Sequence, residues 1–184
     1  MSNGPGFRTT IRVRDVSRQF FAGAGNCSAG VTALSGASVE IRGGEILVVG
    51  GPRGAGKTTL LLCVAGMLHF DAGDILGRAG RVVYRDLAHP SPMIAGWPAL
   101  GAILLDSCDD LGLPVRAQVA TAIECALGSG SAIVLAARDP ECALSLAPSS
   151  ATISIVHLRL GKVLGQRTDA GVANRVAEAV GGGY

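Results

Sequence analysis

The sequence predicts an α/β domain with a mainly parallel sheet flanked by helices, and three observations support this fold class. Short apolar runs alternate along the chain with longer segments of helical character. The motif GPRGAGKT, at residues 51–58, lies between one such run and a helical segment, as a phosphate-binding P-loop does. The 184 residues are 48% hydrophobic and 16% charged, which predicts a single domain over residues 1–184 with flexible ends at 1–8 and 181–184.

The first segments alternate polar and apolar residues with a period of two. Residues 9–15 do so, which predicts a half-buried strand. A glycine-rich stretch at 22–30 predicts a surface loop, and residues 37–45 alternate again before a turn at Gly43 and Gly44. The two alternating segments are typical of strands that place one face against the core.

The following segments predict the parallel sheet and its helices. The apolar run at 46–50 is typical of a strand covered on both faces, and residues 57–68 predict a buried helix. Residues 114–127 predict a second helix, which begins at a proline and carries an apolar stripe of Val115, Val119, Ile123 and Ala126. Further strands are expected at 82–84, 102–106, 132–136 and 153–158, and a further amphipathic helix at 169–180.

Charge, cysteines and hydropathy argue against several classes of protein. The net charge of +2, without a Lys/Arg cluster, argues against nucleic-acid binding. The five cysteines are odd in number and lack CxxC spacing, which indicates free thiols in a reducing compartment. The beginning of the chain lacks the apolar core of a signal peptide. Pro90, Pro92 and Pro98 interrupt the uncharged run 87–105, which predicts a loop and a buried strand rather than a transmembrane segment.

The P-loop motif indicates what its residues do. Its glycines let backbone N–H groups converge on phosphate oxygens, and Lys57 reaches the β- and γ-phosphates of a nucleotide. The Thr58 hydroxyl is a ligand for Mg²⁺. Asp106, at the end of an apolar run, is expected to hold Mg²⁺ through water, with a strand-terminal cap as the alternative role. Asp109 and Asp110 are interpreted as solvated loop acids. The predicted nucleotide-binding residues of the loop are Gly51, Pro52, Arg53, Gly54, Ala55, Gly56, Lys57, Thr58 and Thr59.

Residues 31–75 resemble the first segment of the ATP-binding cassette (ABC) transporter ATPases. The landmarks are Gly44-Glu45 before the strand, then GAGKTTLL, AGML and AGDI. RVRDVSRQF, at residues 12–20, resembles the opening strand of that family, and SAIVLAARDPECALSLA and ISIVHLRLGKVL resemble its last strands. The resemblance covers most of the chain. It implies an ABC-like nucleotide-binding domain with a small N-terminal antiparallel β region, and ATP and Mg²⁺ as ligands.

The resemblance also implies roles for individual residues. Phe20 would stack on adenine, with a core position as its alternative, and Phe21 is the neighbour with which it could be confused. Arg85, in VVYRD, stands where the family has the Gln that senses the γ-phosphate. Arg85 and Arg138 would then approach the γ-phosphate and favour ATP over ADP. Their alternatives are exposure to solvent, or acceleration of phosphoryl transfer as an arginine finger does.

The chain departs from the family at positions that hydrolysis needs. Ser107 follows Asp106 where the family has its catalytic Glu, and Arg138 replaces the His of the switch region. Leu113 replaces the Asp of the loop that bridges two subunits. The interval between Lys57 and Asp106 has no LSGGQ-like signature motif, so the helical subdomain that carries it in the family is expected to be absent. No residue is assigned a catalytic role, and weak hydrolysis or none is expected.

These observations predict an ATP-binding, hydrolysis-deficient accessory or regulatory subunit of a membrane transport system. The resemblance implies a membrane permease, a full-length ABC ATPase subunit or a second copy of the chain as partner, and a cytoplasmic location on the inner face of the membrane. Three alternatives stay open: a slow but active ABC ATPase that energises a transporter, a P-loop small-molecule kinase, and a scaffold that binds no nucleotide. Trp97 is expected either in a docking patch with Met93 and Ile94 or in the core.

Overall fold

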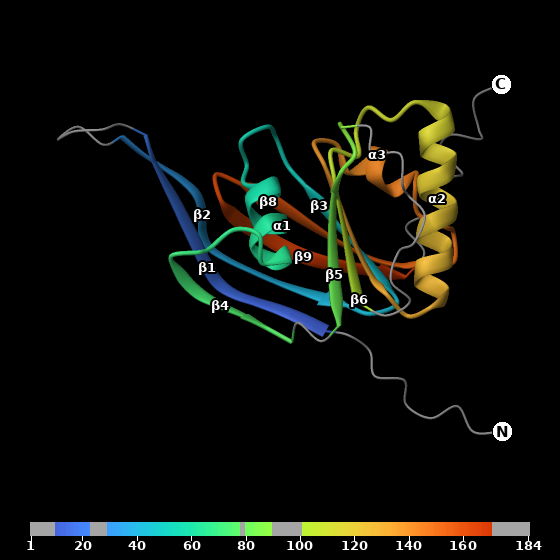
Figure 1. The fold of residues 1–184 in the computed structure, drawn as a ribbon, viewed down its shortest axis with the longest axis horizontal. Helices are drawn as coiled ribbons and strands as arrows, with labels where there is room; N and C mark the ends of the chain where they lie inside the picture. The colour runs from blue at the N-terminus through green and yellow to red at the C-terminus, as the bar shows by residue number, and fades with distance from the viewer. Residues whose placement is uncertain (1–9, 23–28, 78–79, 90–100, 171–184) are drawn as a thin grey trace.

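The computed structural model describes residues 10–22, 29–77, 80–89 and 101–170, which form two sheets (Figure 1). The smaller sheet is antiparallel, in the order β2-β1-β4. The larger sheet has the order β5-β6-β7-β3-β8-β9 and is parallel except for β9. The strands are β1 (Thr10–Ala22), β2 (Ala29–Arg42), β3 (Glu45–Gly50), β4 (Ala72–Leu76), β5 (Arg81–Asp86), β6 (Gly101–Asp106), β7 (Ala132–Ala137), β8 (Thr152–Arg159) and β9 (Lys162–Ala170). The helices are α1 (Lys57–Ala65), α2 (Leu113–Gly128) and α3 (Pro140–Leu144).

The central strands of the larger sheet are apolar because the rest of the domain covers both of their faces. Every residue of β6 and β7 is buried. Along β3, Leu47 and Val49 join the core cluster that contains α1 and the smaller sheet. Ile46 and Val48 join the cluster that contains α2 and α3. Since successive side chains of a strand point to opposite faces, the larger sheet lies between α1 with the smaller sheet on one side and α2 with α3 on the other.

The smaller sheet is held against the larger one through its strand β2. Along β1, Ile11 and Val13 are buried whereas Arg12 and Arg14 are exposed, so this strand places one face against the core. The side-chain amide of Gln166, on β9, joins the two sheets. Its Oε1 accepts from the backbone N–H of Glu40 at 3.3 Å, and its Nε2 donates to the Glu40 carbonyl at 3.2 Å. These two side-chain bonds link β9 to the backbone of β2.

The structure confirms the predicted fold class, a mainly parallel sheet flanked by helices with a small N-terminal antiparallel β region. The expected strands at 46–50, 82–84, 102–106, 132–136 and 153–158 lie within β3, β5, β6, β7 and β8. The chain passes from β5 to β6 through residues 87–100 alone. This connection is too short for a helical subdomain, in agreement with the predicted absence of one.

Other boundaries differ from the prediction. The N-terminal strands are longer than expected, since β1 reaches Ala22 and β2 begins at Ala29, within the range 22–30 predicted as a loop. Val115 is 40% exposed in the first turn of α2, so the buried stripe of that helix consists of Val119, Ile123 and Ala126. The start of the helix expected at 169–180 is wrong, because residues 169 and 170 pair with β8 as the end of β9.

Some expectations fall outside the described residues. These are the remainder of the helix expected at 169–180, the flexible ends at 1–8 and 181–184, and the position of Trp97 with Met93 and Ile94. β4 and α3 were not predicted at all. β4 is a short strand that is stabilised by its antiparallel pairing with β1.

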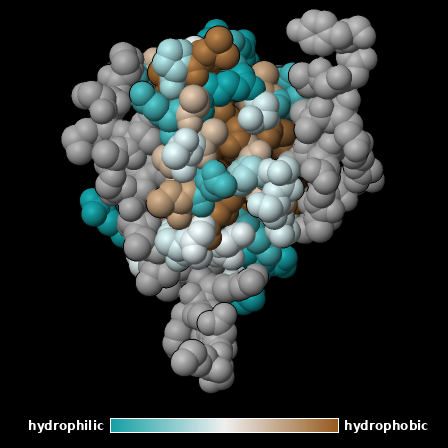
Figure 2. Space-filling view, turned by 90° about the vertical axis from the view of Figure 1, so that its right-hand side faces the viewer, coloured by the Kyte–Doolittle hydropathy of each residue, from teal (hydrophilic) through white to brown (hydrophobic). Residues whose placement is uncertain are grey.

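The surface on the side of α2 mixes polar and apolar side chains (Figure 2). Its apolar residues form separate patches rather than one continuous band. Leu113, at the beginning of α2, is 82% exposed. Within the part of the chain that the structure describes, no helix is both long and apolar enough to cross a membrane.

Candidate phosphate-binding site

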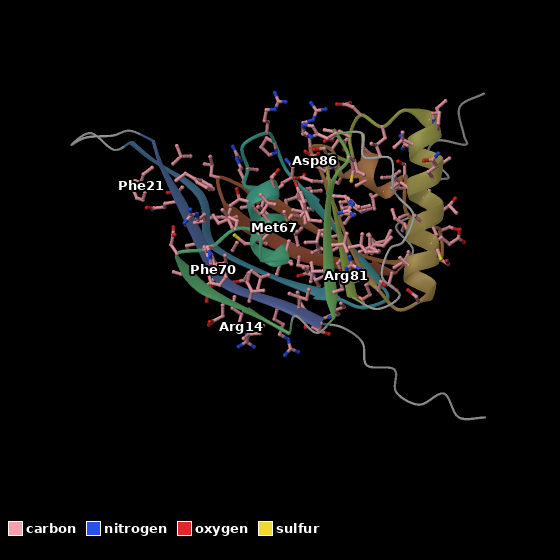
Figure 3. The ribbon with its side chains drawn as sticks, viewed as in Figure 1. Arg14, Phe21, Met67, Phe70, Arg81 and Asp86 are labelled. Carbon is pink, nitrogen blue, oxygen red and sulfur yellow. The ribbon has the colours of Figure 1, made fainter. Side chains whose placement is uncertain are left out.

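A cavity of about 520 Å³ opens at the edge of the larger sheet where β3, β6 and β7 end. The loop after β3, the N-terminus of α1 and the residues that follow β6 and β7 line it, and β1 and β2 contribute Phe20, Val31 and Ala33. Figure 3 shows the strand direction, with Asp86 at the end of β5 nearest this edge and Arg81 at the opposite end. The carboxyl ends of parallel strands are the usual place for a ligand site in an open α/β sheet.

Three glycines give the P-loop its conformation. The backbone φ is +147° at Gly51 and +100° at Gly56, and a Cβ at either position would lie within 2.3 Å of a carbonyl oxygen of the surrounding strands. Another residue there would push the loop away from its supports. Gly54 has φ +78° and open space where a Cβ would be. The loop is therefore packed tightly from behind and free of side-chain bulk where a phosphate would enter.

Lys57 begins α1 and lies over the loop. Its Nζ donates to the carbonyl oxygens of Gly51 at 2.5 Å and Pro52 at 3.0 Å. Gly51 and Pro52 support Lys57 in this way and are not part of the cavity lining, whereas the remaining predicted loop residues, from Arg53 to Thr59, are. Burial lowers the pKa of Lys57, and the charges of Asp109 and Asp106 oppose this shift. A phosphate in the cavity would offer this ammonium stronger acceptors than carbonyl oxygens.

Asp106 ends β6 with a carboxylate that is held in place. The residue is 4% exposed, and its carboxylate accepts from the Tyr84 hydroxyl at 3.2 Å and from the backbone N–H of Ser107 at 2.9 Å. Burial, followed by the charge of Asp106, raises the pKa of Tyr84, so this hydroxyl stays a donor. Thr58 is exposed in the same cavity.

The donor set fits Mg²⁺ only together with a nucleotide. Among the described residues there is no group of three or more His, Cys, Asp or Glu side chains that could hold a metal ion. Mg²⁺ is commonly bound by one or two protein oxygens together with substrate phosphates and water. The Thr58 hydroxyl and the Asp106 carboxylate offer the two protein oxygens. These two residues would hold Mg²⁺, which neutralises phosphate charge when it is bound.

Ser107 lines the cavity at the position after Asp106. Its backbone φ is +60°, and its hydroxyl donates to the carboxylate of Asp86. Burial raises the pKa of Asp86, but hydrogen bonds from Ser107, from the N–H of Ala88 and from His89 outweigh burial and hold this pKa below its usual value. A carboxylate with a lowered pKa accepts a proton poorly, so neither Ser107 nor its partner is a good general base.

Asp109 is not the solvated loop acid that the sequence indicated. Its side chain is 13% exposed, and its Oδ1 accepts the backbone N–H groups of Arg138 at 2.7 Å and Asp139 at 3.1 Å. The reason is that β6 and β7 are neighbours, so the residues that follow them meet. Arg138 lines the cavity, and its guanidinium donates to Asp110 at 2.7 Å. Asp110 is 87% exposed, as expected for a loop acid.

Phe20 and Phe21 differ in their position relative to the cavity. Phe20 lines the cavity at 39% exposure and is not part of either core cluster, whereas Phe21 is 68% exposed and is not part of the lining. The Arg18 guanidinium lies over the Phe20 ring, 4.9 Å from its centroid. Val31 is the cross-strand partner of Phe20 and also lines the cavity. One end of the cavity therefore has an apolar wall, on which a planar base could stack.

Arg85 lies outside the cavity lining, contrary to its expected approach to the γ-phosphate. It is exposed, and its guanidinium donates to the carbonyl of Tyr84 at 2.9 Å. The cause is strand alternation. Tyr84 packs against the core cluster of α1 and bonds Asp106, so the next residue of β5 faces the other side of the sheet.

Several lining residues were missed in the sequence. They are Val31, Ala33, Leu87, Ala88, Asp109, Asp110, Leu111 and Ala136. For Val31, the signal is the pairing of β1 with β2, which places it opposite Phe20. For Asp109, no local pattern points to the contact with the residues after β7.

A family model described as ABC transporter matches residues 34–95 of this chain. The matched segment contains the P-loop, α1, β4 and β5 and ends before β6. The matched segment includes the phosphate loop but not the opposite side of the cavity, which is formed by Asp106, Ser107, Asp109 and Arg138.

The chain is similar to ATP-binding proteins of bacterial import systems. It is 44% identical over 66 residues to a sulfate/thiosulfate import ATP-binding protein of Xylella fastidiosa, which covers 36% of this chain and 17% of that protein. It is 32% identical over 146 residues to an aliphatic sulfonates import ATP-binding protein of Nocardia farcinica, which covers 73% of this chain and 60% of that protein. The matched stretch thus spans only a small part of the first relative and somewhat more than half of the second.

Solved structures of ABC cassettes have the same fold. A dimeric bacterial ABC transporter cassette superposes with a TM-score of 0.65 at 13% identity, covering 86% of this chain and 98% of that one. The ADP conformation of another ATP-binding cassette superposes with a TM-score of 0.64 at 12% identity, covering 94% and 98%. At such low identity the likeness concerns the fold alone.

Proposed function

Because this chain belongs to the family of ABC transporter ATPase domains, we propose that it binds Mg-ATP and hydrolyses it weakly or not at all. The contrast within one cavity carries this proposal. In this proposal the P-loop, Lys57 and Asp106 hold the phosphates and Mg²⁺. Ser107 lines the same cavity at the position to which the family resemblance assigns the general base. Losing a positioned general base costs about 10²–10⁴-fold in rate.

The remaining carboxylates of the site do not replace the missing base. Asp106 is bonded to Tyr84 and Ser107, and Asp109 accepts two backbone N–H groups. Asp110 faces solvent and accepts from Arg138. These contacts give each carboxylate a structural or ion-pairing role, which supports the proposal that the site lacks a general base.

The proposed biological role is that of an accessory or regulatory subunit in a membrane transport system. The similar proteins from Xylella and Nocardia are import ATP-binding proteins, which supports a permease as the partner. A full-length ABC ATPase subunit could complete the site with its own signature motif, and a second copy of this chain is the other candidate. The location proposed with this role is the cytoplasmic face of the membrane.

A slow, active ATPase is the second candidate function, and Arg138 is the observation that favours it. Its guanidinium lies at the cavity, where a cation could stabilise charge that develops during phosphoryl transfer. Phosphate release by the purified chain separates the two candidates, because both of them require ATP binding and only the second requires turnover.

Replacing Phe20 with alanine is expected to weaken ATP binding by about tenfold, since stacking on an aromatic ring contributes roughly 1–3 kcal/mol per base. Arg18 covers one face of the ring, which leaves the other face for adenine. Calorimetric titration of Mg-ATP into each variant measures the effect.

The neighbouring Phe21 provides a matched control. Phe21→Ala removes an equal side chain from outside the cavity lining, so ATP affinity is expected to change by less than about twofold. Equal losses in the two variants, or a larger loss for Phe21→Ala, would show that the apolar wall is not the adenine site.

A further inference from the structure

We propose that Asp109 is a positioning residue that holds Arg138 at the terminal phosphate of a bound nucleotide, and that Asp110 is the counterion from which the triphosphate draws the Arg138 guanidinium. This inference rests on the proposed nucleotide binding. It assigns to the pair Asp109 and Asp110 opposite effects on the preference for ATP over ADP.

Asp109 fixes the backbone that carries Arg138. One oxygen, Oδ1, accepts from the backbone N–H groups of Arg138 and Asp139 at 2.7 and 3.1 Å, and the side chain is 13% exposed. Asp139 is in turn the N-cap of α3 and accepts from the N–H of Glu141 at 3.0 Å. The segment after β7 is therefore tied on one side to the loop after β6 and on the other to α3.

The Arg138 side chain is held much less firmly than its backbone. Its guanidinium donates to Asp110 Oδ2 at 2.7 Å, but Asp110 is 87% exposed and Arg138 is 53% exposed. The second pair, from Nε to Asp109 Oδ2, is 3.5 Å long. Exposed ion pairs of this kind contribute little, because solvent screens them and both side chains lose freedom.

A terminal phosphate would compete well for this guanidinium. Arg138, Lys57 and Asp109 all line the cavity, and the charge of Arg138 is close enough to act on Lys57. Arginine makes forked, charge-assisted hydrogen bonds to phosphate oxygens. If the base stacks at Phe20 and the inner phosphates lie in the P-loop, the last phosphate of a triphosphate points toward the residues after β6 and β7. A diphosphate ends short of them, so the contact selects for the triphosphate.

The proposal makes the two neighbouring acids act in opposite directions. Without the Asp109 side chain the backbone of residues 138 and 139 loses its acceptor, Arg138 loses its place, and triphosphate affinity falls. Without the charge of Asp110 the guanidinium is released, and triphosphate affinity rises. A plain electrostatic effect would differ, because removal of either negative charge near the phosphates would strengthen binding.

The test is calorimetric measurement of the affinity of the full chain, with Mg²⁺, for ADP and for a non-hydrolysable ATP analogue. Arg138→Ala is expected to lose about tenfold in affinity for the analogue and less than about twofold for ADP, since a hydrogen bond to a charged group is lost only with the former. Asp109→Ala is expected to lower the ratio of analogue affinity to ADP affinity, as Arg138→Ala does. Combining the two substitutions is expected to cause no further loss of analogue affinity. Asp110→Asn is expected to raise analogue affinity by about two- to fivefold.

Asp109→Asn serves as the conservative rescue. Its side-chain oxygen can still accept the two N–H groups, so the ratio of affinities is expected to stay near that of the wild type. ADP binding by Asp109→Ala checks that this variant folds. If Asp109→Ala does not fold, Asp109→Asn alone tests the positioning role. A loss of analogue affinity in Asp109→Asn as large as that in Arg138→Ala would overturn it.

Other outcomes overturn the inference directly. They are a rise in analogue affinity in Asp109→Ala, equal losses for ADP and analogue in that variant, or weaker analogue binding in Asp110→Asn. Rapid phosphate release from ATP by the wild type would overturn the proposed function alone, because affinity for the analogue does not depend on turnover. Failure of the wild type to bind either nucleotide would overturn both.

Discussion

Replacing Lys57 with alanine is expected to weaken nucleotide binding by at least about a hundredfold while the protein stays folded. The ammonium is the cation of the P-loop, and it lies over the carbonyls of Gly51 and Pro52, ready to transfer to phosphate oxygens. Several charge-assisted hydrogen bonds are lost at once, each of about 1.5–3 kcal/mol. Equilibrium titration with Mg-ATP and with Mg-ADP measures the loss.

Lys162→Ala is the matched control for this prediction. Lys162 is an exposed lysine at the beginning of β9, outside the cavity lining, so its removal changes the net charge equally without changing the site. We expect unchanged affinity for the control and a similar unfolding temperature for both variants. Wild-type affinity in Lys57→Ala would show that the nucleotide does not bind at the P-loop.

Replacing Asp106 with asparagine is expected to abolish the gain in ATP affinity that Mg²⁺ provides, a loss of about tenfold or more. The buried carboxylate is the acid expected to hold the metal, and asparagine keeps an oxygen for the N–H of Ser107 while removing the charge. In EDTA the variant is expected to bind ATP at least as well as the wild type, because a negative charge near the phosphates has gone. Titrations with Mg²⁺ and with EDTA measure both effects.

The register partner of Asp106 offers the comparison. Asp86 ends β5 beside Asp106 but is not part of the cavity lining. Asp86→Asn is expected to keep the dependence of ATP affinity on Mg²⁺. If Asp86→Asn lost this dependence and Asp106→Asn kept it, the metal would have been assigned to the wrong carboxylate.

Much of the larger sheet was predictable because strands that are covered on both faces leave an unbroken apolar run. This applies to β3, β6 and β7, which the sequence places within one or two residues of their observed ends. The N-terminal strands were harder to predict. Glycine and alanine between 22 and 30 indicate a loop, yet the cross-strand pairing from Phe20 with Val31 to Ala22 with Ala29 extends both strands into that range. Tertiary pairing outweighs local propensity there.

The candidate site was predictable where its chemistry is local and unpredictable where it depends on neighbouring strands. The P-loop could be read because glycines, lysine and threonine occur at fixed spacing in one segment. Asp109 contacts Arg138 across 29 positions of sequence, and only the adjacency of β6 and β7 brings them together. Arg85 is the reverse case. Its position in the motif indicates the γ-phosphate, but alternation along β5 places it on the opposite face of the strand from Tyr84, which bonds Asp106.

The most direct test of the central claim is the release of phosphate from Mg-ATP by the purified chain, measured beside Lys57→Ala and at a protein concentration where binding is saturated. We predict that the wild type binds close to one nucleotide per chain and releases phosphate at a rate close to that of the variant. Magnesium-dependent release that is rapid in the wild type and absent in Lys57→Ala would contradict the claim and identify the chain as an active ATPase.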